Sequence, residues 1–216
     1  MQTKKDIVNE TINYLKTKFS DEFSGHDIWH LLRVRNNAIK IQKHEGGDLF
    51  IIELASLLHD IADAKFYNGD ISIGAVKTLE WLSNFDLDNN KKEHIADIVK
   101  NISFKGEAKK NNNLTLEGMI VQDADRLDAI GAIGIARVFA YSGATGRLIY
   151  DPDQKPITNH TTETYYKNNN TAINHFYEKL LLLKNLMNTN YGKILAEERH
   201  NFMVTFLNRF YTEVEE

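Results

Sequence analysis

Apolar residues recur at helical spacing along almost the whole of this 216-residue chain, and this pattern restricts the fold more than any other feature. Leu31, Val34 and Ala38 lie three or four positions apart, for example, and therefore share one face of a helix. We find no alternating apolar and polar run of useful length, which a half-buried strand would need. The sequence also lacks internal repeats. We therefore predict an all-α fold.

Helix boundaries can be expected from local signals. Ser24 is a candidate N-cap, with Asp27 three residues later in a variant of the capping box, and the helix that it opens should stop at Gly46 and Gly47. Apolar positions at Ile7 and Leu15 indicate an earlier helix. Further helices are predicted at about residues 49–63, 71–85, 91–102, 116–141, 172–187 and 191–214.

The length of the chain allows one domain, and a hydrophobic content of 42% is enough for a core. We assign residues 1–216 to a single domain with a core at about 20–141, a polar loop at about 142–170 and a C-terminal pair of helices at about 171–214. The only two prolines, Pro152 and Pro156, both lie in the polar segment. Loops of this length are uncommon unless they are functional or disordered.

Composition excludes several classes of protein. The net charge of −4 is unlike that of a general nucleic-acid binder, which would be basic. The absence of cysteine excludes disulfides, thiolate catalysis and cysteine-based zinc sites. The first residues lack the apolar core of a secretory signal, and no run approaches the ~18 apolar residues that span a membrane. We expect a cytoplasmic protein with no nucleic-acid or membrane partner. The sequence allows a homodimer as well as a monomer.

Four polar residues in predicted helices, His30, His59, Asp60 and Asp125, indicate a metal site. The adjacent pair His59 and Asp60 interrupts an apolar run, where an unpaired buried polar group costs ~1–3 kcal/mol. Two imidazoles and two carboxylates form a sensible shell for one divalent ion, and they suit Mn, Fe, Co, Ni or Zn. Taken alone, Asp125 could also be a solvated helix residue.

Further polar residues are predicted close to this shell. Asp63 lies four positions after His59, so it could orient or deprotonate a water that the metal activates. Arg33 shares a face with His30 and could neutralise phosphate oxygens. If the ion is octahedral, its two remaining positions can take this water and a phosphoryl oxygen. Together these parts predict metal-assisted hydrolysis of a phosphate ester or anhydride.

Other charged residues are weaker candidates. Lys65 and Lys105 could also bind phosphate, although lysines are more often solvated. His94 lies on the predicted helix 91–102 and faces either the site or solvent. A single histidine on a helix is usually an ordinary surface or hydrogen-bonded residue, and we treat four others in that way: His44, His160, His175 and His200.

The order His30, then His59 and Asp60, then Asp125 resembles the H…HD…D signature of the HD-domain metal-dependent phosphohydrolases. The surrounding segments are similar to a bacterial YedJ- and YpgQ-like subgroup of about this length, and the resemblance covers most of the chain. The segments that carry it are residues 25–34, 58–66, 102–106, 123–134 and 174–180.

This resemblance implies an all-α hydrolase whose metal is held by the four signature residues, with Asp63 as the acidic catalytic residue. Within the subgroup, cleavage of (deoxy)nucleoside triphosphates to monophosphate and pyrophosphate is the expected reaction, with Arg33, Lys65 and Lys105 on the phosphates and His94 assisting. We expect one divalent ion, Mn²⁺ before Co, Ni, Fe, Zn or Mg. The alternatives are a nucleoside monophosphate phosphatase or other phosphoesterase, and a nucleotide-binding sensor without turnover.

Overall fold

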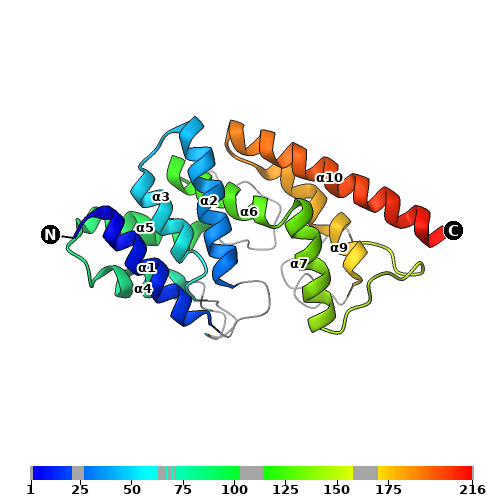
Figure 1. Ribbon diagram of the computed structural model, residues 1–216, viewed down its shortest axis with the longest axis horizontal. Coiled ribbons are helices and arrows are strands. Elements are labelled where there is room, and N and C mark those ends of the chain that lie inside the picture. The colour runs from blue at the N-terminus through cyan, green and yellow to red at the C-terminus, as the bar shows by residue number, and fades with distance from the viewer. Residues whose placement is uncertain are drawn as a thin grey trace. The chain divides into compact units, whose positions relative to one another are not determined.

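A computed structural model describes residues 2–20, 27–62, 67, 70, 72–102, 114–157 and 170–215. Its regular elements within these ranges are helices, and no strand occurs among them (Figure 1). The prediction of an all-α fold is therefore confirmed.

Contacts between backbone segments divide the chain into two compact units. Unit 1 consists of Met1–Ser103 and Asn111–Asp125, and unit 2 consists of Phe104–Lys110 and Arg126–Glu216. The division falls inside one helix, α6 (Leu116–Asp128). The assignment of the whole chain to one domain stays a prediction.

In unit 1 the central element is α3 (Leu49–Leu58), which is apolar on nearly all sides. It packs against α1 (Lys4–Lys18), α2 (Ile28–Glu45) and α5 (Asn89–Ile102). Most of its residues are buried, as expected for a helix without a polar face. Helix α4 (Ile73–Leu82) packs on α5. The core of unit 1 therefore surrounds α3.

The two ends of α2 differ in how well the sequence predicted them. The helix begins at Ile28 with Asp27 as its N-cap, and the Asp27 carboxylate accepts a hydrogen bond from the His30 backbone N–H at 2.8 Å. The predicted start at Ser24 is therefore wrong for this helix, and Ser24 itself lies outside the described residues. The other end is as predicted, because Gly46 ends the helix with a φ of 87°, which favours glycine.

The helix predicted at 49–63 is shorter in the structure. The helix α3 ends at Leu58, with His59 as its C-cap and Asp60 in the turn that follows. The expectation that His59 and Asp60 lie within a helix is therefore wrong. Apolar Ile61 continues the helical spacing beyond this end and is itself buried, so the pattern alone gave no signal to stop.

Unit 2 contains the end of α6 and the helices α7 (Gly131–Ala144), α9 (Ala172–Glu178) and α10 (Asn190–Glu215), with the 3₁₀ helix η2 (Leu180–Leu186). The helices α9 and α10 both contact α7 and η2 (Figure 1). Aromatic rings join them, since Phe176 lies 6.2 Å from Phe139 and 5.9 Å from Phe206 between ring centroids. The predicted helix 172–187 is thus two shorter elements.

The helix predicted at 116–141 is broken into α6 and α7, whose axes differ by 64°. The break follows from Gly131, which has a φ of 75°, a conformation that residues with a side chain rarely adopt. A Cβ atom at this position would also lie 3.0 Å from Cγ of Arg199. Both the turn and the close approach of α10 therefore depend on glycine.

The described part of the predicted loop 142–170 has no helix beyond α7. Two of its residues, Ile157 and Asn170, bond to the same buried carboxylate. Glu178 Oε1 accepts a hydrogen bond from the Ile157 backbone N–H at 2.9 Å and another from the Asn170 side-chain amide. Residues 158–169 lie outside the described part of the chain.

Among the described helices, none is by itself both long and apolar enough to cross a bilayer. Only the bent pair α6 and α7 reaches that length and composition when taken together.

Candidate metal centre

Four side chains from three distant parts of the sequence meet in unit 1. Nε2 of His30 lies 3.3 Å from Nε2 of His59, 3.5 Å from Oδ2 of Asp60 and 3.6 Å from Oδ1 of Asp125. Nε2 of His59 lies 3.5 Å and 3.7 Å from the same two carboxylate oxygens. The first turn of α2, the C-cap of α3 with the turn that follows it, and the C-terminal half of α6 therefore supply one group of four donor atoms.

Backbone hydrogen bonds orient the histidines toward this group. Nδ1 of His59 lies 2.8 Å from the Ser56 carbonyl oxygen, which can only accept, so Nδ1 carries a hydrogen and Nε2 faces the other donors. Such a bond to the far nitrogen is the usual support of a metal-binding imidazole. The Asp27 cap holds the backbone of His30. A backbone carbonyl leaves no trace in a sequence pattern, so the role of Ser56 could not be predicted.

The four residues differ in their exposure to solvent. The side chains of His30 and His59 are 1% and 4% exposed, whereas those of Asp60 and Asp125 are 33% and 35% exposed. The imidazoles therefore form the floor of the group and the carboxylates form its open side. An ion and a water-borne substrate can reach the donors from the carboxylate side.

The carboxylates also change the protonation of the imidazoles. Burial lowers the pKa of His59, but the nearby Asp60 and Asp125 raise it by more, so that this pKa becomes about 9. Desolvation raises the pKa of Asp125, and the opposing effect of His59 and His30 leaves it below its ordinary value. In the metal-free protein, a proton on Nε2 of His59 thus supplies the positive charge beside the two carboxylates that a metal ion would otherwise supply.

The donor set fits a divalent ion. Nitrogen and oxygen ligands bind such ions at ~2.0–2.2 Å, so neighbouring ligands lie about 3.5 Å apart around a tetrahedral ion and about 3 Å apart around an octahedral one. The observed separations of 3.3–3.7 Å match the tetrahedral value and are longer than the octahedral one. The buried pair of imidazoles beside Asp60 can therefore hold one ion, with Asp125 as a fourth donor.

The other predicted site residues have different outcomes. Arg33 is half-buried on α2, three residues after His30. The structure does not bring His94 to the group. Its Nε2 lies 2.9 Å from Oγ1 of Thr115, just before α6 begins, and about ten helical residues, or ~15 Å, separate that point from Asp125. Three further candidates, Asp63, Lys65 and Lys105, lie outside the described residues.

One supporting residue was not recognised as part of the site from the sequence. Asn37 is buried on α2, and its side-chain amide donates to the Ala124 carbonyl oxygen at 3.4 Å, one residue before Asp125. This bond joins the helix that carries His30 to the helix that carries Asp125. Asn37 lies two helical turns from His30 and one turn from Arg33, so the three form a polar stripe along this helix, and that spacing was the available signal.

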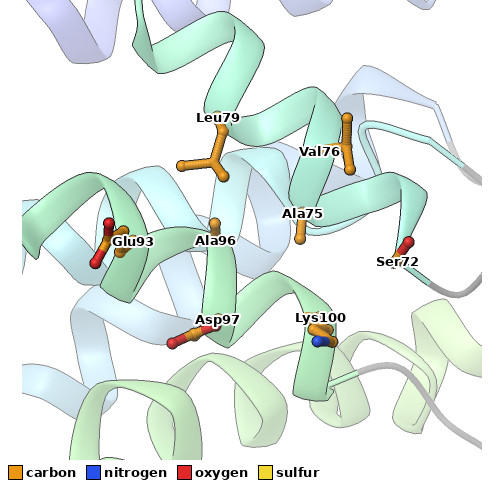
Figure 2. Close-up of a pocket in the computed structure, with 8 residues that line it drawn as sticks. All are labelled: Ser72, Ala75, Val76, Leu79, Glu93, Ala96, Asp97 and Lys100. Carbon is orange, nitrogen blue, oxygen red and sulfur yellow. The ribbon is translucent and has the colours of Figure 1, made fainter. Parts of the chain in front are cut away.

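A shallow hollow lies elsewhere in unit 1, between α4 and α5, with a volume of about 330 Å³. Figure 2 shows apolar Leu79 pointing toward Ala96, with Lys100 further along α5 in the wall of the hollow. None of the four donor residues contributes to it, and no imidazole lines it. The hollow is therefore separate from the group of four donors.

Comparison with known proteins agrees with this geometry. Residues 28–130, which contain all four donors, match the model of the HD domain family. The YpgQ protein of Bacillus subtilis is 37% identical over 202 residues, which are 93% of this chain and 90% of that protein.

Solved structures resemble the chain over almost its full length. A protein from Lactobacillus plantarum has a TM-score of 0.84 and 38% identity, covering 100% of this chain and 99% of its own. An HD-superfamily hydrolase from Bacillus thuringiensis has a TM-score of 0.77 and 42% identity, covering 99% of both chains. YpgQ in complex with ADP has a TM-score of 0.74 and 34% identity, covering 96% of this chain and 97% of its own.

Proposed function

We propose that this chain hydrolyses (deoxy)nucleoside triphosphates to monophosphate and pyrophosphate, because it belongs to the HD-domain superfamily of metal-dependent phosphohydrolases. The observation that carries the proposal is a pair of buried imidazole nitrogens 3.3 Å apart, each 3.5–3.7 Å from one oxygen of Asp60 and one of Asp125, with both carboxylates partly exposed to solvent. The choice of a nucleotide is supported by YpgQ, a relative of similar length whose structure is known in complex with ADP.

His30, His59, Asp60 and Asp125 would hold the ion, which we expect to be Mn²⁺. A divalent ion at this place would polarise a phosphoryl oxygen and lower the pKa of a water molecule near it. The hydrogen bond from His59 to the Ser56 carbonyl oxygen fixes one imidazole, and the Asp27 cap fixes the helical turn that carries His30. The donors are thus arranged before the ion arrives.

The remaining groups would act on the substrate. The water oxygen forms a bond to the α-phosphorus while the bond from that phosphorus to the bridging oxygen breaks, and pyrophosphate leaves. Asp63 would accept the proton of the attacking water. Arg33, half-buried three residues from His30, would neutralise phosphate oxygens, and Lys65 and Lys105 remain further candidates for this role.

The test is to strip the protein of metal, add Mn²⁺, Co²⁺ or Mg²⁺, and identify the products from (d)NTPs, dNMPs and cyclic nucleotides by chromatography. Monophosphate with pyrophosphate is the expected result. Orthophosphate released from a monophosphate would instead show a nucleotidase. Tight nucleotide binding without turnover under every metal would show a sensor module.

Variants separate the metal ligands from the proposed base. Asp60→Ala should lose both bound metal and hydrolysis, whereas Asp63→Ala should keep the metal and lose turnover. Asp97 is an exposed carboxylate on α5, so Asp97→Ala is a matched control that should change neither property. Full activity in a metal-free Asp60→Ala protein would refute the proposed mechanism.

A further inference from the structure

The two tryptophans of the chain lie in very different surroundings. Trp81 stacks on Tyr14 with ring centroids 4.1 Å apart, and its indole N–H donates to Oγ1 of Thr11 at 3.0 Å. Trp29 is 63% exposed. Single exposed apolar residues are common on protein surfaces, so this exposure alone carries no conclusion. The position of Trp29 in the first turn of α2, directly before His30, is what gives it meaning.

Helix geometry places Trp29 next to Arg33 on the surface of α2, with His30 on the other side of Arg33. Successive residues are rotated by about 100° around a helix axis, so Arg33 lies about 40° from Trp29 and about 60° from His30. Arg33 is therefore between the other two around α2, one turn further along. The Nε2 atom of His30 belongs to the donor group. Around α2, the metal donor His30 is thus followed first by the positive charge of Arg33, which can bind phosphates, and then by the exposed aromatic ring of Trp29.

We propose that Trp29 is the stacking surface for the base of the nucleotide substrate, an inference that rests on the proposed function. With its phosphates at the donor group and beside Arg33, a nucleotide extends its sugar and base away from the ion. The indole then offers a flat apolar surface that the base can cover. Because every base has such a face, this contact favours nucleotides over inorganic polyphosphate and selects only weakly among bases.

Fluorescence provides a direct measurement of this contact. In a Trp81→Phe protein, Trp29 is the only tryptophan. An ATP analogue with a methylene group between the α- and β-phosphates, added with Mg²⁺, should quench the emission of Trp29, and this quenching should saturate as the analogue concentration rises. Inorganic tripolyphosphate should leave the emission unchanged. The matched Trp29→Phe protein reports only Trp81 and should show no quenching by the analogue. The proposal would be overturned by saturable quenching of Trp81 in that control, or by the absence of quenching of Trp29 in the Trp81→Phe protein.

Kinetics supply a second readout. Stacking of a base on an aromatic side chain strengthens binding by roughly fivefold at the lower end of its range. Trp29→Ala should therefore raise KM for a nucleoside triphosphate about fivefold or more with kcat little changed, and Trp29→Phe should keep most of the affinity. The inhibition constant of tripolyphosphate should be equal in all three proteins.

The outcomes distinguish this inference from the proposed function. If the unmodified protein hydrolyses nucleotides but Trp29→Ala has the same KM, the stacking role is refuted and the proposed function stands. If the unmodified protein neither binds nor hydrolyses nucleotides, the proposed function itself fails. If Trp29→Ala changes the oligomeric state by sedimentation and leaves KM unaltered, Trp29 is a contact between copies of the chain, which also refutes the stacking role.

Discussion

At His59 a proton and a metal ion compete for one nitrogen. Burial lowers the pKa of this imidazole and the nearby carboxylates raise it by more, to about 9. Below that pH the metal-free protein keeps Nε2 protonated, so binding an ion must release the proton. The apparent metal affinity should therefore rise with pH up to about 9, by about tenfold per pH unit for one displaced proton.

The measurement is a titration of metal-stripped protein with Co²⁺, followed by visible absorption at pH 6.5, 7.5 and 8.5. An unperturbed histidine has a pKa of about 6.5. An affinity that stops rising near that pH would contradict the prediction, because it would mean that the carboxylates do not hold the proton on His59.

Gly131 is a position where a single methyl group should be costly. A left-handed backbone costs a residue with a side chain ~1–2 kcal/mol, and the new Cβ would lie 3.0 Å from Cγ of Arg199. Arg199 also donates to the Leu127 carbonyl oxygen at the end of α6, so a displaced arginine would weaken that bond. Gly131→Ala should therefore lower the free energy of unfolding by about 2 kcal/mol in a urea titration.

Gly143 provides the matched control in the same helix. A Cβ there would meet no atom within 4 Å. Gly143→Ala should leave the free energy of unfolding unchanged or raise it by ~0.4–1 kcal/mol, since alanine restricts the unfolded chain. Equal losses from the two substitutions would show that the turn at Gly131 is not a special conformation.

At the scale of elements, the N-cap of α2 links helix stability to the metal centre. Asp27 satisfies the backbone N–H of His30, and loss of a cap costs ~1 kcal/mol. Asp27→Ala should loosen the first turn and weaken metal binding about fivefold in the same Co²⁺ titration. Asp27→Ser, which keeps a capping oxygen, should bind metal almost normally.

A second cap separates local from global effects. Asp48 caps α3 by accepting from the Phe50 backbone N–H at 2.9 Å, at the opposite end of that helix from His59. Asp48→Ala should lose similar stability with no change in metal affinity. If both alanine variants weakened metal binding equally, the effect of Asp27 would be a general loss of stability.

The same elements show what a sequence can predict. Apolar spacing identified nearly every helix, because each helix must bury one face. Spacing could not locate the end of α3, since Ile61 continues the pattern through the turn that holds His59 and Asp60. It also missed the break before Gly131, whose positive φ depends on how α7 follows α6.

The candidate site was predicted through residue types rather than geometry. Two histidines and two carboxylates indicated a metal shell, and the four side chains do converge. His94 shows the limit of that reasoning, because its residue type is suitable but it contacts Thr115 at the beginning of α6. The packing of α5 on its neighbours decides which residue of the α6 region His94 contacts, and this packing is not visible in the sequence.

For the whole molecule, the distribution of the ligands predicts where an ion adds stability. All four donor residues belong to unit 1, and none belongs to unit 2. An ion at a hundred times its dissociation constant stabilises the folded form by ~2.7 kcal/mol, which is about a hundredfold in the opening equilibrium. Backbone amides of α2 and α3 should therefore exchange about a hundredfold more slowly with deuterium in the presence of metal.

Amides of α9 and α10 in unit 2 supply the internal comparison. They should exchange at the same rate with and without metal, since no ligand lies on these helices. The measurement is hydrogen–deuterium exchange with mass spectrometry on metal-stripped and metal-loaded protein, with Asp60→Ala as the variant in which neither unit should respond. Equal slowing in α10 would mean that both units open in one cooperative step, so that an ion bound by unit 1 stabilises the whole chain.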